Sequence, residues 1–218
     1  MYCFIETICI NDGVIENLSA HDERMNNTIL MHYGSSVMPV SLENFITAEG
    51  CKGRTRCRVE YTSAVEKVEY FPYSIREVKS LQLVNDDAAE YSFKYVDRSV
   101  LDRNFALRGD ADDVVIVRSG MLTDTSIANI ALYKEGKWYT PKYPLLKGTR
   151  RARLLAKGII EEDIIMANSL QEYEKIRLFN AMIGFGEVEI DINNVFLFKT
   201  NNKYKNKNKK FFIDSSII

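Results

Sequence analysis

Residues 122–130 read Leu-Thr-Asp-Thr-Ser-Ile-Ala-Asn-Ile, and they place a single carboxylate, Asp124, among small and polar side chains. The apolar run 114–117 precedes this stretch, and a second apolar run, 130–133, follows it. Both runs have the composition of buried β-strands, and Ser119-Gly120 favours a turn after the first. We therefore expect 122–130 to form a polar turn between two strands, with Asp124 near the protein interior.

A carboxylate in such a place is costly unless a cation or a hydrogen-bond donor meets it. Lys94 lies upstream, and a lysine with a carboxylate is the pair that a pyridoxal phosphate site needs. The lysine forms an imine with the aldehyde of the cofactor, and the carboxylate keeps the pyridine nitrogen protonated so that the ring accepts electrons. The pair alone is a weak signal, because the chain contains 29 Lys and Arg and 30 Asp and Glu residues.

The composition is that of an ordinary globular protein. The chain has 218 residues, 46% hydrophobic and 27% charged, which is enough for one large domain or two small ones. The net charge of -1 gives no general reason to expect binding to nucleic acid or acidic membranes. No apolar run approaches the ~18 residues of a membrane helix. The N-terminus carries Glu6 and lacks a basic segment, which argues against a signal peptide, so we expect a cytoplasmic protein.

The scarcity of histidine limits the chemistry further. His21 and His32 are the only histidines, and neither the Cys3/Cys9 nor the Cys51/Cys57 spacing fits a zinc site. We expect no metal centre, and we expect the four cysteines to be reduced thiols.

Hydrophobic periodicity and turn residues predict a mixed succession of helices and strands. Strands are expected at about 4–10, from 14, and at 54–61, 67–73, 113–118, 129–134, 137–140 and 176–180, and helices at 19–33, 41–48, 97–107, 149–156 and 170–176. Ser19 and Asp22 resemble a capping box for the first helix. Alternation along 54–61 places Arg54, Arg56 and Arg58 on one face of a strand.

One polar segment suggests how the chain is divided. Residues 85–90, Asn-Asp-Asp-Ala-Ala-Glu, are expected to form a hinge between an N-terminal α/β domain, 1–84, and a C-terminal cofactor-binding domain, 91–198. Residues 199–218 form a low-complexity tail with an Asn/Lys-rich run. Binding of nucleic acid by this tail is a minor alternative, because the rest of the chain supplies no matching basic patch.

Six motifs, in this order, resemble the class IV aminotransferases, the pyridoxal phosphate enzymes of fold type IV, over roughly residues 4–190. They are Ile5-Glu6-Thr7-Ile8, His21-Asp22-Glu23-Arg24-Met25, Lys94-Tyr95-Val96-Asp97-Arg98, Leu122-Thr123-Asp124 with Ala128-Asn129, Tyr139-Thr140-Pro141 with Leu145-Leu146-Lys147-Gly148-Thr149, and Phe179-Asn180-Ala181-Met182. Each motif is weak alone, and their common order and spacing make the set specific. Within the family, the chain is most similar to the aminodeoxychorismate lyases.

The resemblance implies an α+β fold, with a small α/β N-terminal domain, a larger β-rich C-terminal domain with flanking helices, and pyridoxal 5′-phosphate between them in a homodimer. It implies that Lys94 is the Schiff-base lysine and proton shuttle, and that Asp124 is the partner of the pyridine nitrogen. Candidates for binding the cofactor phosphate are Arg24, Gly148, Thr149, Asn180 and Ala181. Candidates for binding a substrate carboxylate are Arg56, Arg58 and Thr7, and a solvated strand face is the alternative for the two arginines.

The chain also departs from the family pattern. The family carries Glu where this chain has Asp124. Gly148-Thr149-Arg150-Arg151 stands in place of Gly-Ile-Thr-Arg, so Arg150 occupies the position of a phosphate-binding threonine. The chain begins at the strand that resembles Phe-Glu-Thr and is therefore shortened relative to the family. Altered substrate choice, or cofactor binding without efficient turnover, would be compatible with these changes.

Three functions follow from the resemblance. The first is elimination of pyruvate from aminodeoxychorismate to give p-aminobenzoate, a step of folate biosynthesis, and the second is transamination in amino acid metabolism. Both begin with proton abstraction by Lys94, and the Phe-Asn-Ala-Met segment favours the lyase slightly. The third is a dimer that binds the cofactor without catalysis or lacks it. The shortened N-terminus and Asp124 favour this third function, whereas the retention of Lys94, Arg24 and Asp124 argues against it.

Overall fold

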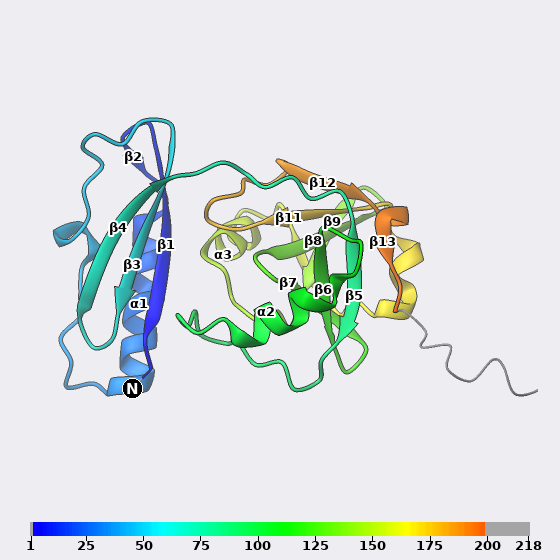
Figure 1. Cartoon of the computed structure of the whole chain (residues 1–218), viewed down its shortest axis with the longest axis horizontal. Helices are drawn as coiled ribbons and strands as arrows, with labels where there is room; N and C mark the ends of the chain where they lie inside the picture. The colour runs from blue at the N-terminus through cyan, green and yellow to red at the C-terminus, as the bar shows by residue number, and fades with distance from the viewer. Residues whose placement is uncertain (1, 199–218) are drawn as a thin grey trace, which may run out of the picture.

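The computed structural model describes residues 2–198, whose strands form three sheets in two parts (Figure 1). The first part is an antiparallel sheet of order β2-β1-β3-β4, with β1 at Phe4–Asn11, β2 at Val14–Ile15, β3 at Arg54–Tyr61 and β4 at Val65–Pro72. Helix α1, Leu18–Tyr33, packs on one face of this sheet against Val59 and Tyr61. Because side chains alternate along a strand, the three arginines of β3 lie on the other face, as predicted.

Two predictions about the first part are wrong. The helix expected at 41–48 is only a 3-10 turn, η1, at Leu42–Asn44. The backbone at the start of this segment bonds instead to side chains of α1: Val40 N donates to Asn26 Oδ1 and Leu42 N donates to Asp22 Oδ1, each at 2.7 Å. The capping box is also missing: Asp22 is used in this tertiary contact, and α1 starts after Asn17, which has a φ of 56° and gives no side-chain cap.

The second part consists of two sheets around one core. One sheet has the order β13-β5-β6-β7, and the other has the order β10-β9-β8-β11-β12. The bounds are β5 Leu81–Asn85, β6 Asp113–Arg118, β7 Met121–Thr125, β8 Asn129–Lys134, β9 Lys137–Pro141, β10 Glu161–Asp163, β11 Lys175–Phe179, β12 Val188–Asp191 and β13 Val195–Phe196. Leu83 and Val115 of the first sheet share a buried cluster with Ile130, Ile176 and Leu178 of the second. The two sheets therefore pack face to face.

Short helices connect these strands. They are α2 Ser99–Phe105, α3 Thr149–Ala156, and the 3-10 turns η2 Ala106–Arg108, η3 Ala167–Glu172 and η4 Ile192–Asn194. The predicted helices at 97–107 and 149–156 are confirmed, and the one at 170–176 is replaced by η3 and the start of β11. None of the helices in the described part of the chain combines the length and apolar character that crossing a bilayer requires.

Two further differences concern the region around Asp124 and the predicted hinge. Asp124 lies on a strand, β7, and the turn that was expected over 122–130 is confined to 126–128, where Thr125 N donates to Ala128 O at 2.9 Å. Residues 81–84 are buried and form β5, which pairs in parallel with β6. The chain therefore leaves the first sheet over 73–80, before the hinge predicted at 85–90.

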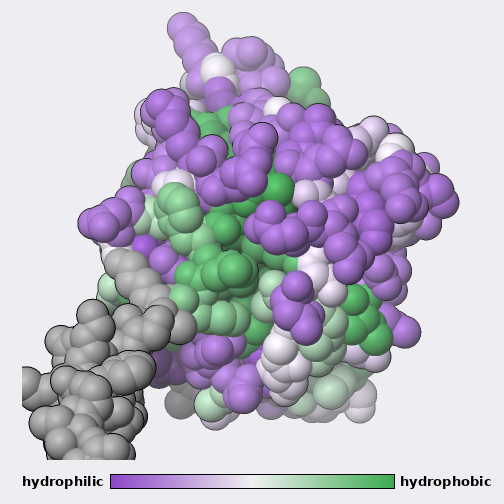
Figure 2. All heavy atoms as spheres, turned by 90° about the vertical axis from the view of Figure 1, so that its right-hand side faces the viewer, coloured by the Kyte–Doolittle hydropathy of each residue, from purple (hydrophilic) through white to green (hydrophobic). Residues whose placement is uncertain are grey.

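The described chain ends at the side of the second part that faces away from the first sheet (Figure 1). There β13 pairs with β5, and Gln82 Nε2 donates to the carbonyls of Phe196 and Leu197 at 3.2 and 2.9 Å. Figure 2 shows apolar side chains gathered on this side of the molecule, and Phe196 and Leu197 are about half exposed, at 45% and 54%. The tail predicted at 199–218 lies outside the described residues.

Candidate cofactor site

A cavity of about 660 Å³, counting its open mouth, lies between the first sheet and the second part of the chain. Its wall combines segments that are far apart in the sequence, from β1 to the loop after β11. Most of the residues predicted for the site line it: Thr7, Arg24, Lys94, Asp124, Gly148, Thr149, Asn180 and Ala181. The structure thus brings these predicted residues to one place.

Lys94 reaches the cavity because its segment lies along an edge of β1. Ile5 N donates to Lys94 O at 2.9 Å, and Val96 N donates to Cys3 O at 2.9 Å. The side chain is half-buried. Burial, reinforced by the positive charges of Arg24 and Arg98, lowers the pKa of Lys94 to about 8, although Glu6 acts in the opposite direction. A lysine of this kind is partly uncharged near neutral pH and can act as a nucleophile or a base.

Arg24 is fixed by a carboxylate buried beneath it. Glu6 on β1 is fully buried, and its oxygens accept bonds from Arg24 Nε, at 2.8 Å, and from Arg24 Nη2. His21 Nδ1 lies 2.6 Å from the same carboxylate. Burial would raise the pKa of Glu6, but Arg24 and His21 outweigh it and hold the pKa at about 2. Glu6 thus fixes the guanidinium through Nε and Nη2 while Arg24 lines the cavity, where a guanidinium is suited to bind an anion.

The start of α3 forms the wall next to Arg24. Gly148 caps this helix and Thr149 is its first residue, and both line the cavity. Thr149 Oγ1 lies 3.3 Å from His21 Nε2, so Glu6, His21 and Thr149 form one chain of contacts. A helix N-terminus beside an arginine is a favourable place for a phosphate group, because both present N–H donors and positive charge.

Asp124 lies elsewhere on the cavity wall and is only 5% exposed. Asn129 Nδ2 donates to its Oδ1 at 2.8 Å, and Leu146 N donates to its Oδ2 at 2.8 Å. Burial raises the pKa of Asp124 to about 6, and these two bonds only partly compensate. The carboxylate is therefore fixed in direction and mostly ionised at neutral pH.

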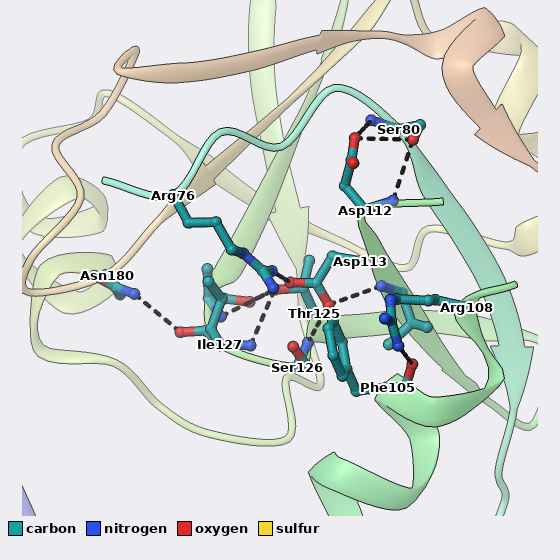
Figure 3. Close-up of polar contacts among 12 residues, drawn as sticks. Arg76, Ser80, Phe105, Arg108, Asp112, Asp113, Thr125, Ser126, Ile127 and Asn180 are labelled. Carbon is teal, nitrogen blue, oxygen red and sulfur yellow. Dashed lines mark hydrogen bonds and ion pairs between the residues drawn. The ribbon is translucent and has the colours of Figure 1, made fainter. Parts of the chain in front are cut away.

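The turn after Asp124 is held by side chains from three segments. Asn180 Nδ2 donates to Ile127 O at 2.9 Å (Figure 3), and Arg98 Nη2 donates to Ser126 O at 2.9 Å. The fully buried Asp113 pairs with Arg76 and accepts a long bond from Ser126 N, at 3.4 Å (Figure 3). Asn180 therefore supports the wall through its side chain, in a role that its sequence motif did not reveal.

Two residues predicted to bind a substrate carboxylate do not line this cavity. Arg56 stacks over the ring of Phe71, with its Cζ 5.0 Å from the ring centroid. Arg58 pairs with Glu60 and Glu69 on its own sheet. Of these three candidates, Thr7 alone lines the cavity. The two arginines do not, because neighbouring aromatic and acidic side chains hold them on the sheet.

Sequence reasoning assigned no role to several residues that shape the site. Arg98 and Tyr91 line the cavity, and Glu6 and His21 support it from behind. All but Tyr91 lie inside the quoted motifs. The charged and histidine residues within these motifs were therefore the signal that could have predicted a role in the site. Arg150 lies behind the wall and does not line the cavity.

Comparisons with known proteins match nearly the whole described chain. The profile of the family described as "Amino-transferase class IV" matches residues 4–190. An uncharacterized protein of Haemophilus influenzae is 35% identical over 195 residues, which cover 84% of this chain and 100% of that protein. A crystal structure from Haemophilus somnus, provisionally named a 4-amino-4-deoxychorismate lyase, is 33% identical, with a TM-score of 0.77 over 84% of this chain and 98% of that one.

A more distant structure supports the fold alone. It comes from Mesorhizobium loti, is provisionally named an amino-acid aminotransferase, and is 20% identical, with a TM-score of 0.71 over 91% of this chain and 100% of that one. Together with the nearer structure, it confirms the predicted α+β architecture.

Proposed function

The chain belongs to the class IV aminotransferases, and from this premise we propose that it is an aminodeoxychorismate lyase-like enzyme that eliminates pyruvate and yields p-aminobenzoate. Pyridoxal 5′-phosphate, the cofactor of the family, is the cofactor of this chain. The observation that carries the proposal is that Lys94, Asp124 and Arg24 line a single cavity together with the start of α3.

The donors around this cavity fit the cofactor. Arg24, held by Glu6, and the N–H groups at the start of α3 would bind its phosphate. Lys94 would hold it covalently, and its lowered pKa supports that role. Asp124 would face the ring nitrogen, since it is a buried carboxylate fixed by Asn129 and Leu146.

When bound, the cofactor withdraws electrons from the substrate carbon that carries the amino group, so that a proton on this carbon becomes acidic. Lys94 Nζ is the group that would take and return this proton, because it lines the cavity and its pKa lies near neutral pH. Asp124 would keep a negative charge beside the ring nitrogen without reorganisation. Glu6 and His21 keep Arg24 and Thr149 in place.

The choice of the lyase over a transaminase rests on two supports. The Haemophilus somnus protein, 33% identical, carries a lyase name. The segment Phe179-Asn180-Ala181-Met182 also resembles the lyase motif. Amino acid transamination on the same site is the second candidate, because its first proton transfer needs the same Lys94 and Asp124.

A direct assay tests the proposal. Purified protein is incubated with pyridoxal phosphate, and its absorbance is recorded before and after borohydride reduction, for the parent, for Lys94→Ala and for the control Lys52→Ala, whose side chain is exposed. The parent and the control should show a reducible band that Lys94→Ala lacks. Aminodeoxychorismate should then give pyruvate and p-aminobenzoate.

The outcomes of this assay separate the alternatives. Transfer of an amino group from amino acids to a 2-oxo acid, with no p-aminobenzoate, would replace the lyase by an aminotransferase. A reducible band with neither reaction would indicate cofactor binding without catalysis. A band that persists in Lys94→Ala would end the assignment of this lysine. We also propose a cytoplasmic homodimer, for which light scattering of the purified protein tests the dimer.

A further inference from the structure

Three consecutive carbonyl groups on the cavity wall accept hydrogen bonds from two arginines. Arg150 Nε donates to Asn180 O at 2.6 Å, and Arg150 Nη2 donates to Ala181 O at 2.9 Å. Arg54 Nη1 donates to Met182 O at 3.2 Å. Asn180, Ala181 and Met182 all line the cavity, whereas neither arginine does. The wall is therefore held from outside by charge-assisted bonds.

Each of these arginines also pairs with a glutamate of the opposite part of the chain. Arg150, on α3 in the second part, lies with Nη2 3.1 Å from Oε2 of Glu16, which precedes α1 in the first part. Arg54, on β3 in the first part, pairs with Glu187 of the second part at 2.6 and 3.1 Å. The two ion pairs thus cross the boundary in opposite directions. The Arg54 pair ends on Glu187 of the loop 180–187, whereas Arg150 reaches this loop through the carbonyls of Asn180 and Ala181.

We propose that Arg54 and Arg150 are positioning residues that clamp the cavity wall 180–182 between the two parts of the chain. Arg54 and Arg150 supply the hydrogen bonds to three successive carbonyls of the loop. The loop needs these bonds because a carbonyl without a partner costs free energy where the loop is packed. Loss of either arginine leaves at least one carbonyl without its donor and also breaks one ion pair between the two parts of the chain. The wall then moves away from the cavity.

The proposal gives Arg150 a role that differs from that of the residue it replaces. In the resembling family a threonine at this position binds phosphate, whereas here the guanidinium turns to the loop and Thr149 lines the cavity. The clamp depends on the proposed function only for the identity of the ligand in the cavity, because all of its contacts lie within the chain. Its test can therefore be made without cofactor as well as with it.

The chain contains a reporter for the position of this loop. Trp138 is the only tryptophan of the sequence, and its ring packs edge-on against Phe185 of the loop, with centroids 5.3 Å apart. Side-chain bonds within the loop give a second reporter: Met182 N and Ile183 N donate to Asn180 Oδ1 at 2.8 and 2.9 Å. Movement of the loop should expose Trp138 to quenchers, and it should expose the backbone amides of the loop to hydrogen exchange.

The experiment compares full-length Arg150→Ala, Arg54→Ala and the control Arg153→Ala, an exposed arginine on the same helix as Arg150. Acrylamide quenching of Trp138 and hydrogen exchange of amides 181–184 are measured with and without pyridoxal phosphate. Both clamp variants should raise exchange of these amides about tenfold and increase quenching, because charge-assisted bonds are lost. Arg153→Ala should match the parent.

Milder variants protect the test against unfolding. Arg150→Lys keeps the charge but cannot reach two carbonyls and a carboxylate together, so it should show an intermediate change. Glu16→Gln should show a smaller change of the same sign. The clamp is overturned if the Arg54 and Arg150 variants, all folded by circular dichroism, behave like Arg153→Ala. Because the readouts do not require the cofactor, a protein that never binds it can still confirm or overturn the clamp.

Discussion

Gly148 and Asn129 lie in direct contact, and a Cβ atom at position 148 would come within 2.1 Å of Asn129 Oδ1. The same Asn129 amide donates through Nδ2 to Asp124 Oδ1 and to Leu146 O, each at 2.8 Å. The turn proposed to bind the phosphate and the carboxylate proposed to face the ring nitrogen are therefore connected through one side chain. This explains why glycine is required before α3, although its φ is not positive.

Gly148→Ala should weaken cofactor binding and lower the stability of the protein. The added methyl group must displace Asn129, which costs about 1–3 kcal/mol for overpacking of this kind, and the bond to Asp124 is lost with it. Urea denaturation and titration with pyridoxal phosphate measure the two effects. The double variant Gly148→Ala/Asn129→Ala removes the clash, so its stability should be no lower than that of Asn129→Ala. Additive losses would show that the contact does not matter.

Glu6→Gln should destabilise the protein at neutral pH and less in acid. The pKa of Glu6 is held at about 2, below its ordinary 4.5, so the ionised side chain stabilises the folded state above pH 4.5 and this stabilisation is lost as the pH falls from 4.5 to 2. The shift corresponds to on the order of 3 kcal/mol at pH 7. Urea denaturation at pH 7 and pH 3.5 should show the smaller difference in acid. The control is Glu23→Gln, an exposed residue of α1, the helix that carries the Glu6 partners Arg24 and His21. Equal losses at both pH values would contradict the role of the Arg24 and His21 pairs.

The sequence indicated the residues that line the cavity better than the residues that support them. The order of the motifs indicated Lys94, Arg24 and Asp124, because each of these residues lies within a short stretch that resembles a family motif. The strand that carries Asp124 was missed, since Thr-Asp-Thr-Ser is polar and only tertiary bonds to Asn129 and Leu146 make it a buried strand. The side-chain directions of Arg56 and Arg58 could not be predicted from the sequence, because they depend on the aromatic and acidic partners that the fold brings near.

Removal of residues 199–218 should leave the fold and cofactor binding intact. The described chain ends at the side facing away from the first sheet, and the cavity is lined by residues from 7 to 182. A shorter chain that ends at Val195 should be less stable, because Gln82 Nε2 would lose its acceptors on Phe196 and Leu197. Thermal unfolding and cofactor titration of the two truncated chains check this. Loss of cofactor binding in the chain that ends at residue 198 would assign a role to the tail.

The rate of cofactor incorporation should depend on pH through Lys94. Only the uncharged amine attacks an aldehyde, and the pKa of Lys94 is lowered to about 8. The rate should therefore rise about tenfold per pH unit below 8 and level off above it. Stopped-flow absorbance after mixing with pyridoxal phosphate measures this profile. Arg98→Met removes one of the positive charges that lower the pKa and should shift the profile to higher pH. A midpoint near 10.5 in the parent would show that Lys94 is not perturbed.

Asp124→Asn should slow proton abstraction far more than it weakens cofactor retention. Retention would rest on Lys94, Arg24 and the start of α3, whereas the Asp124 carboxylate is held by Asn129 and Leu146. The electron demand of the ring depends instead on a negative charge at its nitrogen. Loss of one preorganised electrostatic contact of this kind costs about 10²-fold or more in rate. The matched variant Asp124→Glu restores the family's residue and the charge, and it should retain more activity than Asp124→Asn. Exchange of the substrate α-proton with deuterated solvent measures the step directly, and the pyridoxal phosphate content of the purified variants measures retention. If Asp124→Asn exchanged this proton at the parent rate, the ring would not depend on Asp124, and another acid would have to supply the charge.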